Sequence, residues 1–379
     1  NMRTERTLKP IREDRYLPMQ NKNILIMAGG TGGHVYPALA VADTLKLEGF
    51  KLFWLGSNNG LEKNIVPKHG YTLLKINVKG IRGKGIFHLL SAPFFIVASI
   101  FQALLVMVKI RPVIVLGMGG FASGPGGIAA WLMRIPLLIH EQNSIAGLTN
   151  RLLSPFAVSV MTAFPEVFKN SDKTIITGNP IRYEIEKISK PENRYINLKP
   201  KELRILVLGG SLGAEKLNKI VPATISSLGN EYVLKVKHQC GEKNFSKTQS
   251  IYKDYNLNID LTPYIDDMVH AYTWADLVIC RAGASTISEI TACGIASILI
   301  PYPFAVDNHQ MSNAKYLSDQ GAAILIEEEK CNIDKLKNIL LDFINTPDLL
   351  LGMAKKAKNL SKPEATNNVA KLCIEVFYA

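Results

Sequence analysis

One pattern occurs twice in the sequence and constrains the fold more than any other feature: an apolar strand, a glycine-rich turn and a helix. Residues 23–27 (NILIM) run into AGGTGGH and then into a helical pattern. Residues 204–208 (RILVL) run into GGSLGA and a second helical pattern, about 180 residues further on. Strand, glycine turn and helix in this order are typical of doubly wound α/β domains. The repetition therefore predicts two such halves, each built on a parallel sheet.

The length of 379 residues is sufficient for two domains. Residues 1–22 contain no apolar segment of the kind found in secretory signals and are predicted to be a disordered leader. The two predicted domains comprise residues 23–186 and 202–360. Residues 187–201 (KISKPENRYINLKPK) are polar, contain two prolines and are predicted to be the linker. Residues 361–379 are predicted to include a last helix, and the pattern leaves open whether it packs back on the N-terminal domain or on the other half.

The chain is basic, because 44 lysines and arginines face 32 aspartates and glutamates, which gives a net charge of +12. Such an excess favours an anionic partner: a nucleic acid, a membrane surface or a phosphorylated substrate. The five cysteines are scattered, odd in number and without a CxxC spacing. This usage favours a reducing cytoplasm, in which the thiols serve as small side chains of the core.

Residues 63–140 contain no acidic residue and nine basic ones, and they enclose the apolar run 86–108. The run is long enough to span a membrane. However, the strand-like segments 72–78 and 113–116 on either side are expected to belong to one sheet, which disfavours a span. A plain buried helix and a helix that docks on a membrane surface both remain open. The basic surroundings favour docking on anionic lipid. The predicted membrane-facing residues are Ile86, Phe87, Phe94 and Phe101, with Lys79, Arg82 and Lys84 as a basic rim.

The first glycine-rich turn is predicted to bind a phosphate or diphosphate. Gly29, Gly30, Gly32 and Gly33 allow the backbone to approach an anion closely, and the following helix start supplies amide donors. A purely structural role, packing strand on helix, is the alternative. The turn is neither a Walker loop nor a dinucleotide fingerprint, since Val35 replaces the third glycine of GxGxxG and no acid follows the second strand. The sequence therefore disfavours hydride transfer, and no cofactor is predicted.

Seven motifs occur in order and together resemble the MurG family of peptidoglycan N-acetylglucosaminyltransferases. They are GGTGGHVYPALA, GMGGFASGPGG, IHEQNSIAGLTNR, TGNPIR, GGSLGA, CRAGASTISE and DNHQMSNA, and the likeness runs from about residue 23 to residue 326. The resemblance implies a GT-B fold, in which two Rossmann-like domains face an interdomain cleft. It also implies an inverting transfer of GlcNAc from UDP-GlcNAc to undecaprenyl-diphosphate-MurNAc-pentapeptide (lipid I), which gives lipid II and UDP. No metal is expected, and no Asp-x-Asp motif is present in the sequence.

The same resemblance implies which residues bind the donor. On the C-terminal half, the Ile265 backbone would meet the uracil, the helix start at 284–289 would hold the diphosphate, and the Glu289 carboxylate would accept hydrogen bonds from the ribose. The complete predicted donor set is Thr31, Gly32, Gly33, Asn143, Arg182, Ser211, Ile265, Ala284, Ser285, Thr286, Ile287, Ser288, Glu289 and Gln310. One departure is His309, which stands where the family often has glutamine. The implied location is the cytoplasmic face of the inner membrane, as a peripheral protein, with other cell-wall synthesis proteins as further partners.

An inverting transfer needs a base that takes the proton of the acceptor hydroxyl. His34 is the predicted base, because it directly follows the glycine-rich turn and an imidazole titrates near neutral pH. Glu141 is the alternative.

Two other functions remain open: another UDP-sugar enzyme of the same architecture, such as a UDP-GlcNAc 2-epimerase, and a basic nucleic-acid-binding protein. The sequence contains no known RNA-binding motif, which disfavours the last of these.

Overall fold

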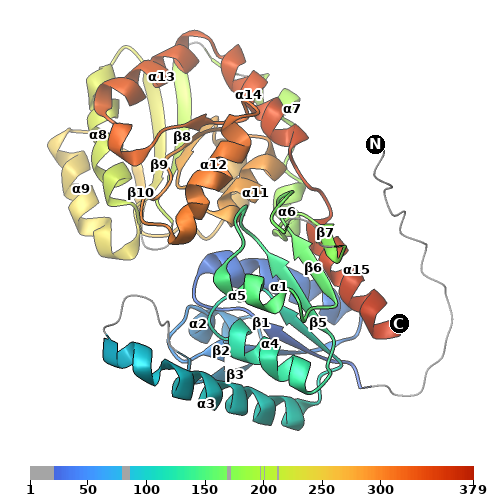
Figure 1. Ribbon diagram of the computed structural model, residues 1–379. Coiled ribbons are helices and arrows are strands. Elements are labelled where there is room, and N and C mark those ends of the chain that lie inside the picture. Colours follow the sequence, from blue (N-terminus) through green and yellow to red (C-terminus); the bar gives the residue numbers. More distant parts are fainter. Residues whose placement is uncertain (1–20, 79–85, 169–171, 197, 200, 211–212) are drawn as a thin grey trace.

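The structure is a computed structural model that describes residues 21–78, 86–168, 172–196, 198–199, 201–210 and 213–379. Four of the predicted site or membrane residues lie outside the described residues: Lys79, Arg82, Lys84 and Ser211. The same holds for residues 1–20 of the predicted leader. For residues 86–92, including Ile86 and Phe87, the structure describes the backbone alone. The described chain forms two lobes, each around a parallel sheet (Figure 1).

The N-terminal lobe contains a seven-stranded sheet in the order β3-β2-β1-β4-β5-β6-β7, and all neighbours are parallel. The central strands are short and apolar because a parallel sheet is covered on both faces. The strands are β1 (Asn23–Met27), β2 (Lys51–Ser57), β3 (Thr72–Ile76), β4 (Ile114–Gly117), β5 (Leu137–Glu141), β6 (Ser159–Thr162) and β7 (Thr174–Ile176).

Helices cover both faces of this sheet. Ile24 and Ile26 of β1 pack in a cluster with α1 and α15, whereas Leu25 and Met27 pack in a cluster with α3 and α4. This alternation follows from the two-residue period of a strand. The helices of the lobe are α1 (Gly32–Leu47), α2 (Glu62–Lys68), α3 (Ile86–Ile110), α4 (Ser123–Leu132), α5 (Leu148–Leu153) and α15 (Ala365–Tyr378).

The C-terminal lobe repeats the architecture with a six-stranded parallel sheet in the order β10-β9-β8-β11-β12-β13. Its strands are β8 (Glu202–Leu208), β9 (Val233–Gln239), β10 (Asp260–Thr262), β11 (Leu277–Cys280), β12 (Ala296–Leu299) and β13 (Ile324–Leu325). Its α-helices are α6 (Tyr183–Glu186), α7 (Pro191–Tyr195), α8 (Glu215–Leu228), α9 (Phe245–Asp254), α10 (Met268–Trp274), α11 (Ala284–Cys293), α12 (His309–Ser318), α13 (Ile333–Asn345) and α14 (Asp348–Asn359). Three short 3-10 helices complete it: η1 (Glu242–Asn244), η2 (Val306–Asn308) and η3 (Glu328–Lys330).

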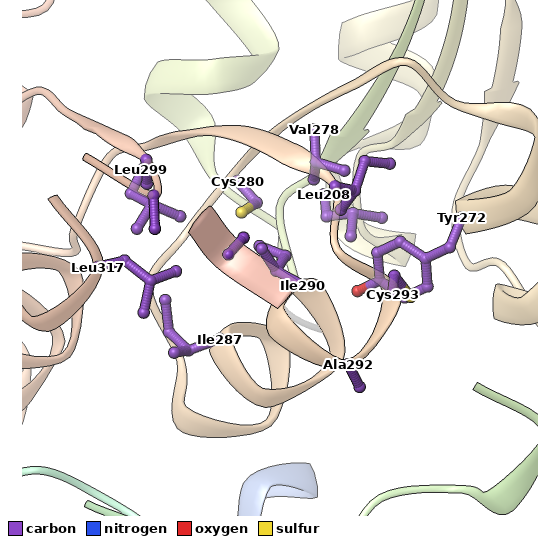
Figure 2. Packing of buried hydrophobic residues seen from close by; sticks show 14 of the residues in the cluster. Leu208, Tyr272, Val278, Cys280, Ile287, Ile290, Ala292, Cys293, Leu299 and Leu317 are labelled. Atoms are coloured by element: carbon purple, nitrogen blue, oxygen red, sulfur yellow. The ribbon is translucent and has the colours of Figure 1, made fainter. Parts of the chain in front are cut away.

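The core beneath α11 explains why this helix keeps a fixed position. Its residues Ile287, Ile290 and Cys293 point into a cluster with Val278 and Cys280 of β11 (Figure 2). All five cysteines of the chain are buried as free thiols, as the sequence predicts. The buried side of α11 thus fixes the direction in which its amino end points.

The segment predicted as a linker belongs to the C-terminal lobe, which is a difference from the sequence-based prediction. Within residues 187–201, α7 packs against α14, and Tyr195 is buried with its hydroxyl donating to the Asp276 backbone oxygen at 2.7 Å. Arg194 donates to the backbone oxygen of Tyr272 at 3.2 Å. A few apolar and hydrogen-bonding side chains are enough to hold this otherwise polar stretch in place.

The C-terminal segment crosses back to the N-terminal lobe. Helix α15 packs on α1, and the ring of Phe377 meets that of Phe50 edge-on at 5.2 Å between centroids. Figure 1 shows α15 lying along the N-terminal lobe, next to α1. The chain therefore connects the lobes twice.

The GT-B fold class predicted from the sequence, with two Rossmann-like domains, is confirmed.

Candidate functional site

The carboxyl-terminal edges of the two sheets face each other, and the loops on them touch. The loop after β5 reaches α12, where the Ser144 backbone N–H and hydroxyl donate to Asn313 Oδ1 at 2.9 and 2.8 Å. Asn313 Nδ2 in turn donates to Asn143 Oδ1 at 3.3 Å. Tyr36 and Tyr264 bring their hydroxyl oxygens to 3.1 Å across the same boundary. Ligands of parallel α/β sheets bind at this edge, so these loops frame the candidate site.

The first glycine-rich turn is held by a buried carboxylate that the sequence analysis missed. Glu62, at the start of α2, is 0% exposed. Its Oε2 accepts the Gly30 N–H at 2.9 Å, and its Oε1 accepts the N–H and hydroxyl of Ser57 at 2.8 and 2.7 Å. A Cβ on Gly29 would lie 2.5 Å from Glu62 Oε1, so glycine is needed to make room for the carboxylate. The turn is therefore fixed from below by Glu62.

His34 lies in the first turn of α1, against the loop that follows β4. Gly119 and Gly120 adopt φ of +99° and +93°, conformations that favour glycine. A Cβ on Gly119 would lie 2.6 Å from His34 Nδ1, and one on Gly120 would lie 2.5 Å from the Gly29 oxygen. His34 Nδ1 is 3.1 Å from Gln142 Oε1. Gly119 thus makes room for the imidazole ring, and Gly120 makes room for the first glycine-rich turn.

Glu141, the alternative base, is buried and already accepts several hydrogen bonds. Its Oε1 accepts from the backbone and side chain of Asn143 at 3.0 and 3.2 Å. Its Oε2 accepts from the Gly147 N–H at 3.0 Å and from Asn150 Nδ2 at 2.8 Å. Both carboxylate oxygens therefore serve to fold the loop that follows β5. Both oxygens of Glu141 are thus occupied by donors of its own loop, whereas the hydrogen bond of His34 is made through Nδ1.

The amino end of α11 faces the first glycine-rich turn. A Cβ on Gly33 would lie 4.0 Å from Ser285 Oγ, which brings predicted residues of the two lobes together. The Ser285 hydroxyl is buried and has no hydrogen-bond partner among the described residues. The first amides of a helix have no intrahelical acceptor, and the first turn of α11 contains no acidic residue. Ala284, Ser285 and Thr286 therefore present donors suited to an anion.

Two of the predicted donor residues further along α11 make contacts within the C-terminal lobe. Ile287 is buried in the core of the lobe (Figure 2), and the Ser288 hydroxyl donates to the Ala284 backbone oxygen at 2.9 Å. These two side chains therefore belong to the helix and its core. Behind them lies a small pocket that opens to solvent. It is lined by Ala163, Phe164, Asn179, Ile181, Ile287, Ser288, Thr291, Ala292, Tyr316, Leu360, Ser361 and Lys362.

Glu289 and Arg182 are brought together. Arg182 Nη2 lies 3.6 Å from Glu289 Oε1, and the Tyr272 hydroxyl donates to Glu289 Oε2 at 2.9 Å. Burial raises the pKa of Glu289, whereas Arg182 and Tyr272 act in the opposite direction. The carboxylate is held at the edge of the site with 16% of its side chain exposed. It is thus oriented and still within reach of a ligand.

Two further predicted residues make contacts that the sequence does not reveal. The Ile265 N–H donates to Gln239 Oε1 at 3.1 Å, so one of its two backbone polar groups is engaged by a side chain. Gln310 Oε1 accepts the Tyr302 N–H at 3.0 Å and thereby fixes the loop before α12. Within the part of the chain that the structure describes, no three histidine, cysteine, aspartate or glutamate side chains are grouped so that they could hold a metal ion.

A large apolar surface, which we call the α3 surface, lies on the outer side of the N-terminal lobe. Ser99, Ala103 and Met107 form the buried side of α3, whereas Phe94 is 80% and Phe101 60% exposed. The α3 surface consists of Phe94, Phe95, Val97, Phe101, Leu105 and Val108, and exposed Trp131 of α4 lies on the neighbouring helix. Of the described helices, only α3 has an 18-residue window (Pro93–Ile110) apolar enough to cross a membrane; its mean hydropathy is 2.1, and 22% of it is buried.

Comparison with known proteins gives concordant matches over both lobes. The model of the glycosyltransferase family 28 N-terminal domain matches residues 24–162, and that of the C-terminal domain matches residues 204–369. A protein of Azotobacter vinelandii named UDP-N-acetylglucosamine–N-acetylmuramyl-(pentapeptide) pyrophosphoryl-undecaprenol N-acetylglucosamine transferase is 46% identical, covering 93% of this chain and 98% of its own.

Solved structures agree with these matches. The crystal structure of MurG from Acinetobacter baumannii is 40% identical, with a TM-score of 0.80, and covers 93% of this chain and 99% of that one. The UDP-GlcNAc 2-epimerase from Neisseria meningitidis, bound to UDP-GlcNAc, has a TM-score of 0.64 over 93% of this chain and 100% of that one. At 11% identity that second likeness shows the fold alone.

Proposed function

The chain belongs to the MurG family within glycosyltransferase family 28, and we propose that it catalyses the reaction named for its relatives. It transfers GlcNAc from UDP-GlcNAc to lipid I and forms lipid II in peptidoglycan synthesis. It is thus a UDP-GlcNAc-dependent N-acetylglucosaminyltransferase. The observation that carries this conclusion is identity of about 46% over 93% of the chain, spread over both lobes of the fold.

We place the donor on the C-terminal lobe. The amino end of α11, with the unpaired Ser285 hydroxyl, suits the diphosphate of UDP, because helix amides and the helix dipole favour negative charge. Glu289, oriented by Tyr272 and Arg182, would accept hydrogen bonds from the ribose hydroxyls. Arg182 lies beside this carboxylate and is partly exposed, so its guanidinium is available to the departing diphosphate.

We place the reacting hydroxyl of the acceptor beside His34. In this step the hydroxyl oxygen forms a bond to the anomeric carbon of GlcNAc from the face opposite the diphosphate. The bond between that carbon and the UDP oxygen breaks, and UDP keeps the electron pair. His34 takes the hydroxyl proton, while the amides of α11 and Arg182 stabilise the charge that develops on UDP. Thr31, Gly32 and Gly33 line the region between the two substrates.

We propose that the α3 surface docks on an anionic membrane, where a lipid-linked acceptor would be found. The helix connects β3 and β4 of one sheet, so its two ends lie on the same body of the protein. Phe94 and Phe101 project outward on one side of it. Lys109 in the last turn of α3, Arg111 just after α3 and Arg134 just after α4 are exposed basic residues. Exposed apolar side chains within a basic surround are the features that interfacial binding needs. This docking corresponds to a peripheral location at the cytoplasmic face of the inner membrane.

The assignment is tested by following UDP release from UDP-GlcNAc with and without a lipid I analogue. We expect release that depends strictly on the acceptor. UDP at 100 times its Kd should stabilise the fold by about 2.7 kcal/mol, and RNA should not stabilise it. Acceptor-independent conversion to UDP-ManNAc would instead identify an epimerase, and stabilisation by RNA alone would identify a nucleic-acid-binding protein.

A further inference from the structure

Gln142, which the sequence analysis did not select, makes two hydrogen bonds at the centre of the candidate site. It follows Glu141 at the end of β5 and is buried. Its Nε2 donates to the Met118 backbone oxygen at 2.7 Å, and its Oε1 lies 3.1 Å from His34 Nδ1. Gln142 therefore connects the loop that follows β4 to the imidazole ring.

The Met118 carbonyl fixes which end of the Gln142 amide faces the ring. A carbonyl oxygen can only accept a hydrogen bond, so the atom of Gln142 opposite it must be the NH₂ group. A flipped amide would place two oxygens 2.7 Å apart without a hydrogen between them. The amide oxygen must then face His34, and this oxygen also can only accept. The hydrogen between the two residues consequently belongs to His34 Nδ1.

A neutral imidazole carries one hydrogen, so a protonated Nδ1 leaves Nε2 with a free electron pair. His34 Nε2 has no hydrogen bond to any residue within the described ranges, and the side chain is partly exposed. Turning the ring over would place Cδ2–H against Gln142 Oε1 and lose the hydrogen bond of Nδ1. The lone pair of Nε2 is thus directed away from Gln142, which is the arrangement that a base requires.

We propose that Gln142 is a positioning residue that holds His34 in the Nδ1–H tautomer, so that Nε2 can accept the proton of the attacking hydroxyl. The proposal rests on the proposed function, and on His34 as its base. After proton transfer the ring is an imidazolium that still donates Nδ1–H to Gln142 Oε1. The hydrogen bond therefore persists through the step, and its charge-assisted form stabilises the product of the proton transfer.

The ionisable neighbours of the ring do not replace Gln142 in this role. The 118–121 loop contains no ionisable side chain. On β5, burial lowers the pKa of His140 to about 4, so it is neutral near pH 7. Glu141 uses both oxygens within its own loop, and Glu62 uses both on Gly30 and Ser57. Among the described residues, Gln142 is the one that hydrogen-bonds to Nδ1.

The tautomer is measured directly by ¹⁵N NMR of the full chain labelled at histidine, with His34→Gln used to assign the His34 signals. In the neutral ring, we expect Nδ1 to show the chemical shift of a protonated nitrogen and Nε2 that of an unprotonated one. Gln142→Met removes the acceptor for Nδ1–H. The ¹⁵N shifts of Nδ1 and Nε2 should then move toward each other, as in a mixture of tautomers, or swap their values, as in the Nε2–H tautomer. A wild-type ring with its hydrogen on Nε2 would overturn the proposal.

Kinetics of two variants separate tautomer control from a purely structural role. Gln142→Met should lower kcat at least ~10-fold and leave the KM for UDP-GlcNAc within ~2-fold, since general-base catalysis contributes about 10² to 10⁴. Gln142→Glu keeps an acceptor for Nδ1–H, and its carboxyl, when protonated, donates to the Met118 oxygen in place of the amide, so this variant should retain most of kcat. Ionisation of that carboxyl favours the imidazolium, so the acid limb of its pH–rate profile should move to higher pH.

Equal loss of kcat in Gln142→Met and Gln142→Glu would mean that an acceptor for Nδ1–H at this position does not support the rate, and it would contradict the proposal. The base itself is tested separately by His34→Ala, for which we expect kcat to fall ~10²-fold or more. If His34→Ala were nearly normal while the NMR shifts followed Gln142, the tautomer assignment would stand and the choice of base would fail. The two ideas can therefore be rejected independently.

Discussion

At the scale of single residues, three glutamates at the candidate site divide into one that faces the ligand region and two that hold loops. Glu289 keeps part of its surface exposed, whereas Glu141 and Glu62 accept bonds from the loops beside them. An ionised carboxylate has acceptors alone, so it is stable inside a protein where several donors converge on it. Glu141 and Glu62 thus accept more hydrogen bonds from the protein than Glu289 does, which separates the two residues that hold loops from the one that is placed to bind a ligand.

Glu289→Gln should weaken donor binding and raise stability at neutral pH. Because burial raises the pKa of Glu289, the folded state binds a proton more tightly than the unfolded state, and ionisation of this group costs stability as pH rises. The amide removes that cost. We expect urea unfolding at pH 7–8 to show a variant at least as stable as wild type, with the difference shrinking as pH falls through the Glu289 pKa, and a raised KM for UDP-GlcNAc. An unchanged KM would contradict the ribose assignment.

Glu62→Gln should destabilise the lobe and disturb the first glycine-rich turn. Three donors meet the carboxylate, and an amide offers one oxygen, so at least one donor would face another donor. The expected loss in unfolding free energy is about 1–3 kcal/mol. Ser57→Ala is the matched control, since it removes one bond to the same carboxylate and leaves Gly30 attached. A fall in kcat/KM for the acceptor in both variants alike would argue against a specific effect through Gly30.

At the scale of elements, α3 differs from the other helices because its outer side is apolar. Replacing Phe94 and Phe101 by serine should hardly change the melting temperature, since both side chains are largely exposed. Each buried Phe contributes about 1.5–3 kcal/mol, so binding to anionic vesicles should weaken at least ~10-fold. Ile196→Ser, on the C-terminal lobe and 76% exposed, is the control and should bind as wild type does. A large fall in melting temperature would mean that the two rings belong to the core.

Local patterns were sufficient to predict the elements of the fold, and insufficient for some contacts between them. The two strand–turn–helix units, the parallel sheets and the placement of α3 between two strands follow from apolar runs and glycines close together in sequence. The placement of α7 on the C-terminal lobe does not, because Tyr195 and Arg194 find partners some 80 residues away. Gln142 and Glu62 were missed for the same reason: their importance lies in loops that meet only in the folded chain.

At the scale of the whole molecule, the proposed function requires both lobes at once. His34 and the first glycine-rich turn belong to one lobe, and the amino end of α11 belongs to the other. Asn313 joins them by hydrogen bonds to the Ser144 loop, and α15 returns the end of the chain to the N-terminal lobe. A donor on one lobe and an acceptor on the other would therefore meet between loops that the fold holds opposite each other.

The most direct test follows the sugar. UDP-GlcNAc labelled in its GlcNAc is incubated with the chain and a lipid I analogue in vesicles, and the lipid fraction is analysed by mass spectrometry. We expect the label in a lipid product that is heavier than the acceptor by one GlcNAc residue, in amounts equal to the UDP released. Labelled free sugar or labelled UDP-ManNAc, with the acceptor unchanged, would contradict the account.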